Sequence, residues 1–169
     1  MKLIPIFLLF TTLSVFSQKT VFDIARSGTL DEIKTLHKQN PDAINAVNEN
    51  GFSVLILATY RSNNEVANFL IQNVKDVDFT CSLGSALMAA TYKSNNVIVQ
   101  NLLKKGANPN IKDTNGMTSL MLAAQFGNVE IIKLLLAHKA DKSLLNNEEK
   151  SAFEFAVFSG NNEIIEHLK

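Results

Sequence analysis

The chain has 169 residues, equal numbers of basic and acidic side chains (16 each) and a hydrophobic content of 46%. The length is that of a single domain, and the apolar content excludes a disordered chain. The zero net charge lacks the long-range attraction that nucleic acid or an anionic membrane surface requires, so neither is expected as a partner. The single cysteine, Cys81, excludes an intrachain disulfide and a zinc site built from several cysteines.

Residues 1–17, MKLIPIFLLFTTLSVFS, have the pattern of a secretory signal peptide. Lys2 supplies a positive charge, residues 3–10 are almost entirely apolar, and small residues precede the expected cleavage after Ser17. The apolar run is too short to span a bilayer, and no second one follows. We therefore expect export to the periplasm or the extracellular space, with no membrane span in the mature chain and with Cys81 unpaired in an oxidising compartment. The alternative is an uncleaved anchor or a buried first helix.

The rest of the chain repeats itself. Four segments are alike, and they are TYRSNNEV from Thr59, TYKSNNVI from Thr91, QFGNVEI from Gln125 and VFSGNNEI from Val157. The residues that mark the same place in successive units are Gly28, Ser62, Ser94, Gly127 and Gly160. The interval between them is about 33 residues, which indicates a repeat protein.

The fourth unit shows the predicted elements most clearly. Asn115-Gly116 favours a turn, and the hydroxyl of Thr118 is expected to cap a short helix. That helix should end at Gly127 in a left-handed residue, before a second helix over residues 129–136. Helices this short are unstable alone, so their core must form by stacking of the units.

The two middle units carry serine, at Ser62 and Ser94, where the helix-ending glycine is expected. We expect the asparagines that follow, Asn63 and Asn95, to supply the left-handed residue, because asparagine tolerates that conformation.

These residues resemble the ankyrin repeat family. The family pattern is matched best by DTNGMTSLMLAAQFGNVEIIKLLLAHKA from Asp113 to Ala140, and it is visible in the other units. The resemblance implies an all-α ankyrin-repeat solenoid of about five helix-turn-helix repeats with short β-turn fingers. The approximate repeats are 19–49, 50–82, 83–114, 115–147 and 148–169.

The chain departs from the family pattern near the start of each first helix. The family proline is replaced by Val54, Ala86, Ser119 and Ala152. The family histidine, which joins adjacent turns through hydrogen bonds, is replaced by Ile56, Met88, Met121 and Glu154. We therefore expect the loops to be held less firmly.

No pattern in the chain indicates catalysis. The three histidines, His37, His138 and His167, fall in different repeats without a paired carboxylate or nucleophile, and Cys81 has no basic neighbour in sequence. Phosphate-binding loops and metal-ligand clusters are also missing from the sequence. The chain is therefore expected to be no enzyme, with no cofactor and no metal.

The resemblance implies instead a protein-binding surface on the concave face, formed by turn tips and by the two residues before each marker residue. The candidates for protein binding are Arg26, Asn50, Phe52, Tyr60, Arg61, Tyr92, Lys93, Asn115, Met117, Gln125, Phe126 and Phe158. Tyr60 and Tyr92 are the only tyrosines of the sequence, and each precedes a cation. Because tyrosine and arginine are enriched at interface hot spots, we expect Tyr60, Arg61, Tyr92 and Lys93 at the centre.

Two alternatives remain open from the sequence. The aromatic residues, Phe126 and Phe158 above all, could pack along the first helices as peripheral core. The function could be that of an inhibitor, immunity protein or stabilising partner of an exported enzyme, or that of an envelope-organising scaffold, to which Phe153, Phe155 and Phe158 of the last repeat point. A monomeric module that binds a protein partner is the main expectation.

Overall fold

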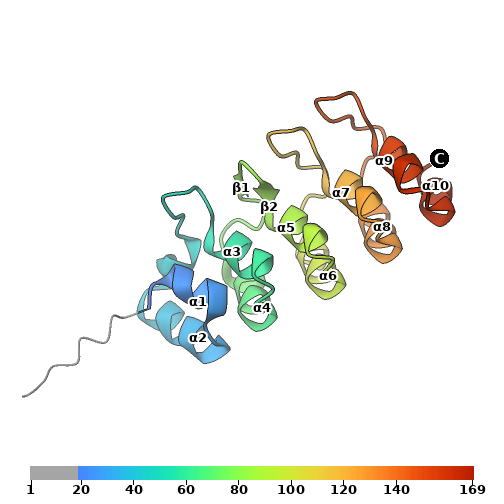
Figure 1. Cartoon of the computed structure of the whole chain (residues 1–169). Helices are drawn as coiled ribbons and strands as arrows, with labels where there is room; N and C mark the ends of the chain where they lie inside the picture. Colours follow the sequence, from blue (N-terminus) through green and yellow to red (C-terminus); the bar gives the residue numbers. More distant parts are fainter. Residues whose placement is uncertain (1–18) are drawn as a thin grey trace, which may run out of the picture.

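The computed structural model describes residues 19–169, which form ten α helices arranged as five stacked helix-turn-helix pairs (Figure 1). The first helices of the pairs are α1 (Val21–Ser27), α3 (Val54–Tyr60), α5 (Ala86–Tyr92), α7 (Ser119–Gln125) and α9 (Ala152–Ser159). The second helices are α2 (Leu30–Gln39), α4 (Asn64–Asn73), α6 (Asn96–Lys104), α8 (Val129–Ala137) and α10 (Asn162–Leu168). The expected all-α solenoid is confirmed, while the expected signal peptide lies outside the described residues.

Extended loops, which we call fingers, connect each pair to the next along one edge of the stack (Figure 1). A 3-10 helix, η1 (Pro41–Asn45), precedes the first finger, whose sides meet in a bridge between Val47 and Ser53. The second finger contains a two-stranded antiparallel hairpin of β1 (Thr80–Cys81) and β2 (Gly84–Ser85).

Each first helix begins at a hydroxyl side chain that accepts a hydrogen bond from a backbone N–H of the first turn. The caps are Thr20, Ser53, Ser85, Thr118 and Ser151. Thr118, which accepts from the N–H of Met121, confirms the cap predicted for the fourth repeat. These bonds satisfy amides that a helix leaves without a partner at its start.

The first helices of the last four repeats end in left-handed residues, whereas α1 ends at Gly28 in extended backbone with φ of −81°. Two of the left-handed residues were assigned wrongly from sequence. Gly127 has the predicted positive φ of 72°. In the middle repeats the serines themselves adopt it, with φ of 57° at Ser62 and 52° at Ser94. The asparagines that follow have φ of −78° and −91°, so the expectation for Asn63 and Asn95 is wrong.

The physical reason lies in what the asparagine side chains do. Asn63 donates from Nδ2 to the carbonyl oxygen of Gly28 at 2.9 Å, which joins the second repeat to the first. Asn95 caps the next helix and donates from Nδ2 to Oδ1 of Asn64 at 2.7 Å. Asn128 makes the equivalent bond to Asn96 at 3.2 Å. Asparagine thus serves as helix cap or as link between neighbouring repeats, and the preceding residue must make the turn.

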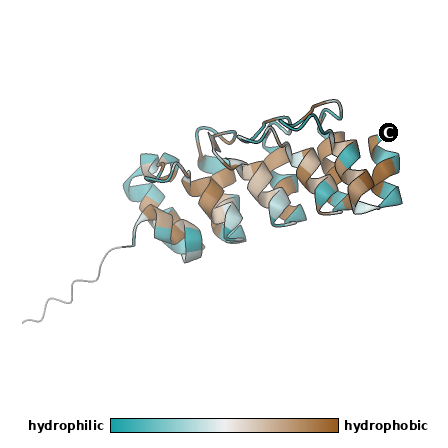
Figure 2. Cartoon of the chain, turned by 45° about the horizontal axis from the view of Figure 1, so that its top comes forward, coloured by the Kyte–Doolittle hydropathy of each residue, from teal (hydrophilic) through white to brown (hydrophobic). Residues whose placement is uncertain are grey.

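The core runs through all five repeats without a break. Hydrophobic segments recur in every helical pair (Figure 2), and the buried side chains form one cluster from Ile24 to Leu168. A column of fully buried alanines, Ala58, Ala90, Ala123 and Ala156, lets neighbouring first helices pack closely. Each repeat therefore completes its core against its neighbours.

The later fingers are hydrogen-bonded to one another despite the missing family histidine. Thr114 donates from Oγ1 to the carbonyl oxygen of Ser82 at 2.9 Å, and Asn147 donates from Nδ2 to that of Thr114 at 3.0 Å. The expectation of loosely held loops is wrong here, because other side chains make the links. It does fit the first two fingers: within residues 19–169, no hydrogen bond joins residues 46–53 to residues 80–85.

Candidate functional site

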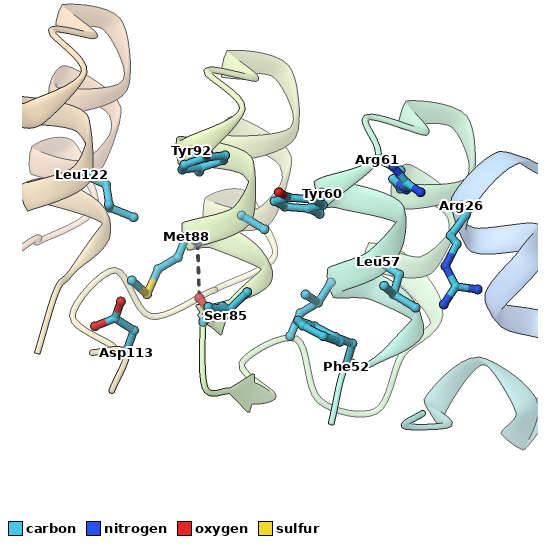
Figure 3. Close-up of a pocket in the computed structure, with 13 residues that line it drawn as sticks. Arg26, Phe52, Leu57, Tyr60, Arg61, Ser85, Met88, Tyr92, Asp113 and Leu122 are labelled. Carbon is cyan, nitrogen blue, oxygen red and sulfur yellow. Dashed lines mark hydrogen bonds between the residues drawn. The ribbon is translucent and has the colours of Figure 1, made fainter. Parts of the chain in front are cut away.

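A pocket of about 630 Å³ lies along α1, α3, α5 and α7, and the first two fingers form one of its sides (Figure 3). We call it the central pocket. Its lining residues are Arg26, Phe52, Ile56, Leu57, Tyr60, Arg61, Leu83, Ser85, Met88, Ala89, Tyr92, Asp113 and Leu122. The volume lies within the range of ligand-binding pockets in proteins.

An aromatic row crosses the central pocket from the second repeat to the fourth. The rings of Tyr60 and Tyr92 are stacked with centroids 6.0 Å apart and planes 18° apart. Phe126 continues the row edge-on, 5.5 Å from the Tyr92 centroid. These side chains are 43%, 51% and 48% exposed, respectively, so they pack on one another while half of their surface faces solvent. Packing as peripheral core therefore explains only the covered half of each ring.

The aromatic row follows from the repetition of the same position in stacked units. Tyr60 and Tyr92 each occupy the last residue of a first helix, α3 and α5. Stacking of these helices places the two equivalent residues side by side. Aromatic pairs in this geometry are favourable by about 0.5–1.5 kcal/mol beyond their buried area, which holds the rings in place before any partner arrives.

Three cations of the first three repeats lie beside this row. The Lys93 ammonium lies 5.5 Å from the centroid of the Tyr60 ring, a cation–π contact. Arg61 and Arg26 line the pocket, and Figure 3 shows both side chains on the side of the first repeat. Arg26 contacts Asp23 at 3.4 Å. Hydrogen bonds from Thr20 are the main cause that lowers the pKa of Asp23, with a smaller contribution from Arg26.

The floor of the pocket is apolar, and one glycine fixes part of it. Leu57, Ala89 and Leu122 lie one helical turn before the last residue of their helices. Met88 lies beside Gly84, whose φ is 92° and where a Cβ atom would stand only 2.3 Å from the Met88 sulfur. The absence of a side chain at Gly84 therefore makes room for Met88.

The candidate residues from the sequence divide into groups. Arg26, Phe52, Tyr60, Arg61 and Tyr92 come together in the central pocket, and Lys93 and Phe126 adjoin it through Tyr60 and Tyr92.

Gln125 and Phe158 lie apart from these, in a second hollow of about 360 Å³. Phe158 is 77% exposed, with the Lys150 ammonium 5.6 Å from its ring centroid. Phe153 and Phe155 are half-buried against the core, so they offer less surface than the sequence suggested.

The three turn-tip candidates differ in exposure. Asn50 and Asn115 are exposed on their fingers. Met117 is buried in the core, where Asn146 donates from Nδ2 to its sulfur at 3.5 Å. The structure thus places Met117 as a packing residue inside the stack.

Sequence reasoning missed the floor and Leu83. Leu57, Ala89 and Leu122 stand three residues before Tyr60, Tyr92 and Gln125, a spacing that puts them on the same helix face. That signal was present in the sequence. Leu83, exposed at the hairpin turn, has no counterpart in the other fingers and carried no such signal.

The residues described contain no group of histidine, cysteine, aspartate and glutamate that could hold a metal ion. Cys81 is partly buried and its sulfur donates to the Gly84 carbonyl oxygen at 3.4 Å. None of the helices over residues 19–169 has the length and apolar character needed to cross a membrane.

Comparison with known proteins identifies the repeats. The sequence pattern described as ankyrin repeats (3 copies) matches residues 21–113 and, in an overlapping match, residues 87–169. An ankyrin repeat-containing protein of Treponema pallidum is 33% identical over 136 residues, which are 73% of this chain and 46% of that protein. The nuclear factor NF-kappa-B p105 subunit of Gallus gallus is 28% identical over 148 residues, which cover 81% of this chain and 15% of that protein.

A third relative is closer in length. The Notch-regulated ankyrin repeat-containing protein B of Danio rerio is 31% identical over 100 residues, covering 56% of this chain and 90% of that protein. The chain spans less than half the length of the Treponema and chicken relatives. Their similarity therefore concerns the repeats they share with this chain.

Proposed function

Because the chain belongs to the ankyrin repeat family, we propose that it is an exported module without catalytic activity that binds a protein partner in the central pocket. Ankyrin repeats are generally modules of protein–protein interaction. The observation that carries the proposal is the aromatic row of Tyr60, Tyr92 and Phe126, which remains half exposed over an apolar floor. Large aromatic side chains around a hollow are the usual anchors of protein interfaces.

The position of the pocket supports this proposal. The first two fingers, which form one side of the pocket, are not hydrogen-bonded to each other over the described residues, whereas the later fingers are linked. A partner segment that enters between Phe52 and Leu83 therefore displaces no finger-to-finger bond. Exposed apolar surface of this kind is covered in a complex more often than it is left to water.

Export is the second part of the proposal, and it rests on residues 1–17 alone. Expression of the full chain in a secreting host should yield a product that begins at Gln18, found outside the cytoplasm. N-terminal sequencing of that product measures the cleavage point. A product that keeps Met1 and stays in the cytoplasm would contradict this part of the proposal and leave the binding part intact.

The binding part is tested by capture of partner proteins from an envelope extract with the immobilised chain. The double substitution Tyr60→Ala with Tyr92→Ala should abolish capture, while the helical circular dichroism signal stays unchanged. The matched control is Val97→Ala with Leu145→Ala, which removes two exposed apolar side chains outside the pocket. Capture that persists in the tyrosine variant, or is lost equally in the control, would contradict a site in the central pocket.

A further inference from the structure

The charges along the concave face are distributed unevenly. In the two positions before the marker residue, the first three repeats each carry one cation, and these are Arg26, Arg61 and Lys93. The last two repeats carry none there, but have Gln125 and Phe126, then Phe158 and Ser159. The chain as a whole has no net charge, so this excess of positive charge is local to the region of the pocket, which Arg26 and Arg61 line and which Lys93 adjoins through Tyr60.

These cations have few carboxylate partners of their own. Among residues 19–169, Arg61 and Lys93 form no ion pair, and Arg26 has only the 3.4 Å contact with Asp23. Lysines elsewhere are paired more closely, as Lys133 is with Glu163 at 2.9 Å and Lys75 with Asp42 at 2.7 Å.

The one carboxylate that lines the pocket is already engaged. Asp113 accepts at Oδ1 from the backbone N–H groups of Asn115 and Met117, both at 2.8 Å. It belongs to the third finger, away from Arg26 and Arg61 (Figure 3). The pocket therefore has a cationic end at the first two repeats and an apolar floor between that end and Leu122.

From this charge distribution we propose that the central pocket binds an acidic segment of its protein partner. The segment inserts a large apolar side chain over Leu57, Met88 and Leu122 and places carboxylates against Arg26, Arg61 and Lys93. This inference rests on the proposed function and specifies the chemistry of the partner. Complementary charge of this kind mainly sets which partner is chosen and how fast it associates.

The test uses a phage-displayed library of random short peptides selected against the purified chain at low ionic strength. We expect enrichment of peptides in which aspartate or glutamate stands near phenylalanine, leucine or tryptophan. Their affinity should fall about tenfold for Arg61→Gln with Lys93→Gln, because close charge pairs are lost, and should be abolished by Tyr60→Ala with Tyr92→Ala. Selection against Arg61→Glu with Lys93→Glu should enrich lysine and arginine instead.

A matched control separates the pocket from overall charge. Lys34→Glu with Lys104→Glu changes the net charge by the same amount on α2 and α6, where both lysines are exposed and outside the pocket. This variant should select the same acidic peptides as the unmodified chain. Thermal unfolding of every variant checks that the fold is kept.

The outcomes distinguish the two proposals. Peptides that depend on Tyr60 and Tyr92 but show no acidic preference would overturn the acidic segment and leave the binding site in place. Peptides that bind regardless of the two tyrosines would overturn both. Failure to enrich any peptide would also count against the acidic segment, since a pocket that takes a short linear segment should select one.

Discussion

The second and third repeats differ from the fourth in the residues that end the first helix. They carry Thr-Tyr-Arg-Ser and Thr-Tyr-Lys-Ser, whereas the fourth carries Ala-Gln-Phe-Gly. The serines hold a left-handed conformation that costs a non-glycine residue about 1 kcal/mol or more. The repeats that supply the two tyrosines thus end their first helix in a less favourable residue, serine, whereas the fourth repeat ends it in glycine. The two exposed tyrosines and the favourable helix-ending glycine are therefore found in different repeats.

The largest effect is expected at Gly84, which belongs to the third repeat. Gly84→Ala should lower the free energy of unfolding by about 2 kcal/mol, because the new Cβ meets the Met88 sulfur and the φ of 92° is strained. The matched control is Gly51→Ala in the first finger, where φ is 81° but no atom lies within 4 Å. Urea unfolding should show a clearly smaller loss for Gly51→Ala, and equal losses would mean that the contact with Met88 is not decisive.

Exchanging the helix-ending residues tests the comparison directly. Ser62→Gly and Ser94→Gly should each raise the free energy of unfolding by about 0.5–1 kcal/mol, because glycine adopts positive φ without strain. Gly127→Ser in the fourth repeat should lower it by a similar amount. Denaturant unfolding measures all three, and serine variants that are no more stable would show that Ser62 and Ser94 are not strained.

The second and third repeats also differ in the hydrogen bonding of an equivalent buried threonine, Thr59 and Thr91. Thr91 donates from Oγ1 to the Leu87 carbonyl oxygen at 2.9 Å, but the equivalent hydroxyl of Thr59 has no hydrogen-bond partner within the described part of the chain. Thr91→Val should therefore cost about 1 kcal/mol, while Thr59→Val should be neutral or stabilising. Chemical denaturation of both variants gives the difference, and a larger loss for Thr59→Val would contradict this account.

A fall in pH should destabilise the first helices of the two terminal repeats before those of the middle repeats. Thr20 lowers the pKa of Asp23 below its ordinary 3.8, and Ser151 lowers that of Glu154 below 4.5, in both cases through hydrogen bonds. A carboxyl with a lowered pKa stabilises the fold above its unfolded-state value and loses that contribution as pH falls through the folded value. Helices α3, α5 and α7 are capped by hydroxyl groups alone, which do not titrate.

The expected result is a small loss of protection in α1 and α9 as the pH falls below about 4, with little change in α3 and α5. Amide hydrogen exchange at pH 6 and pH 3 measures it. Asp23→Asn and Glu154→Gln are the control variants, and they should remove most of the pH dependence of the corresponding helix. Uniform loss of protection across the stack would contradict the assignment to the caps.

Much of the fold followed from the sequence because the repeat marks the same positions several times. The period placed the helices, and the register placed Tyr60 and Tyr92 in one column, which the structure shows as a stacked pair. The left-handed serines were missed because intrinsic preference favours asparagine there, while the hydrogen bonds of Asn63 and Asn95 to a neighbouring repeat outweigh it. Such bonds depend on which side chains face each other across an interface, and a single repeat does not reveal them.

The pocket was predictable only in part for the same reason. Its wall of aromatic and cationic residues follows from the register. Leu83 and the position of Gly84 against Met88 depend on how one finger folds back onto one helix. Met117 was misplaced because the tip of a finger is usually exposed, whereas in this finger the side chain turns into the stack.

The asparagine links carry a consequence for how such a chain can grow. The third repeat accepts a bond at Asn96 from the repeat that follows and donates one from Asn95 to the repeat before. Tandem duplication of this unit creates one new junction, where Asn95 of the second copy would meet Asn96 of the first and could donate the same bond. Each duplication would add one tyrosine to the aromatic row and one lysine beside it, so the length of this exposed surface would change by whole repeats without redesign of either terminus.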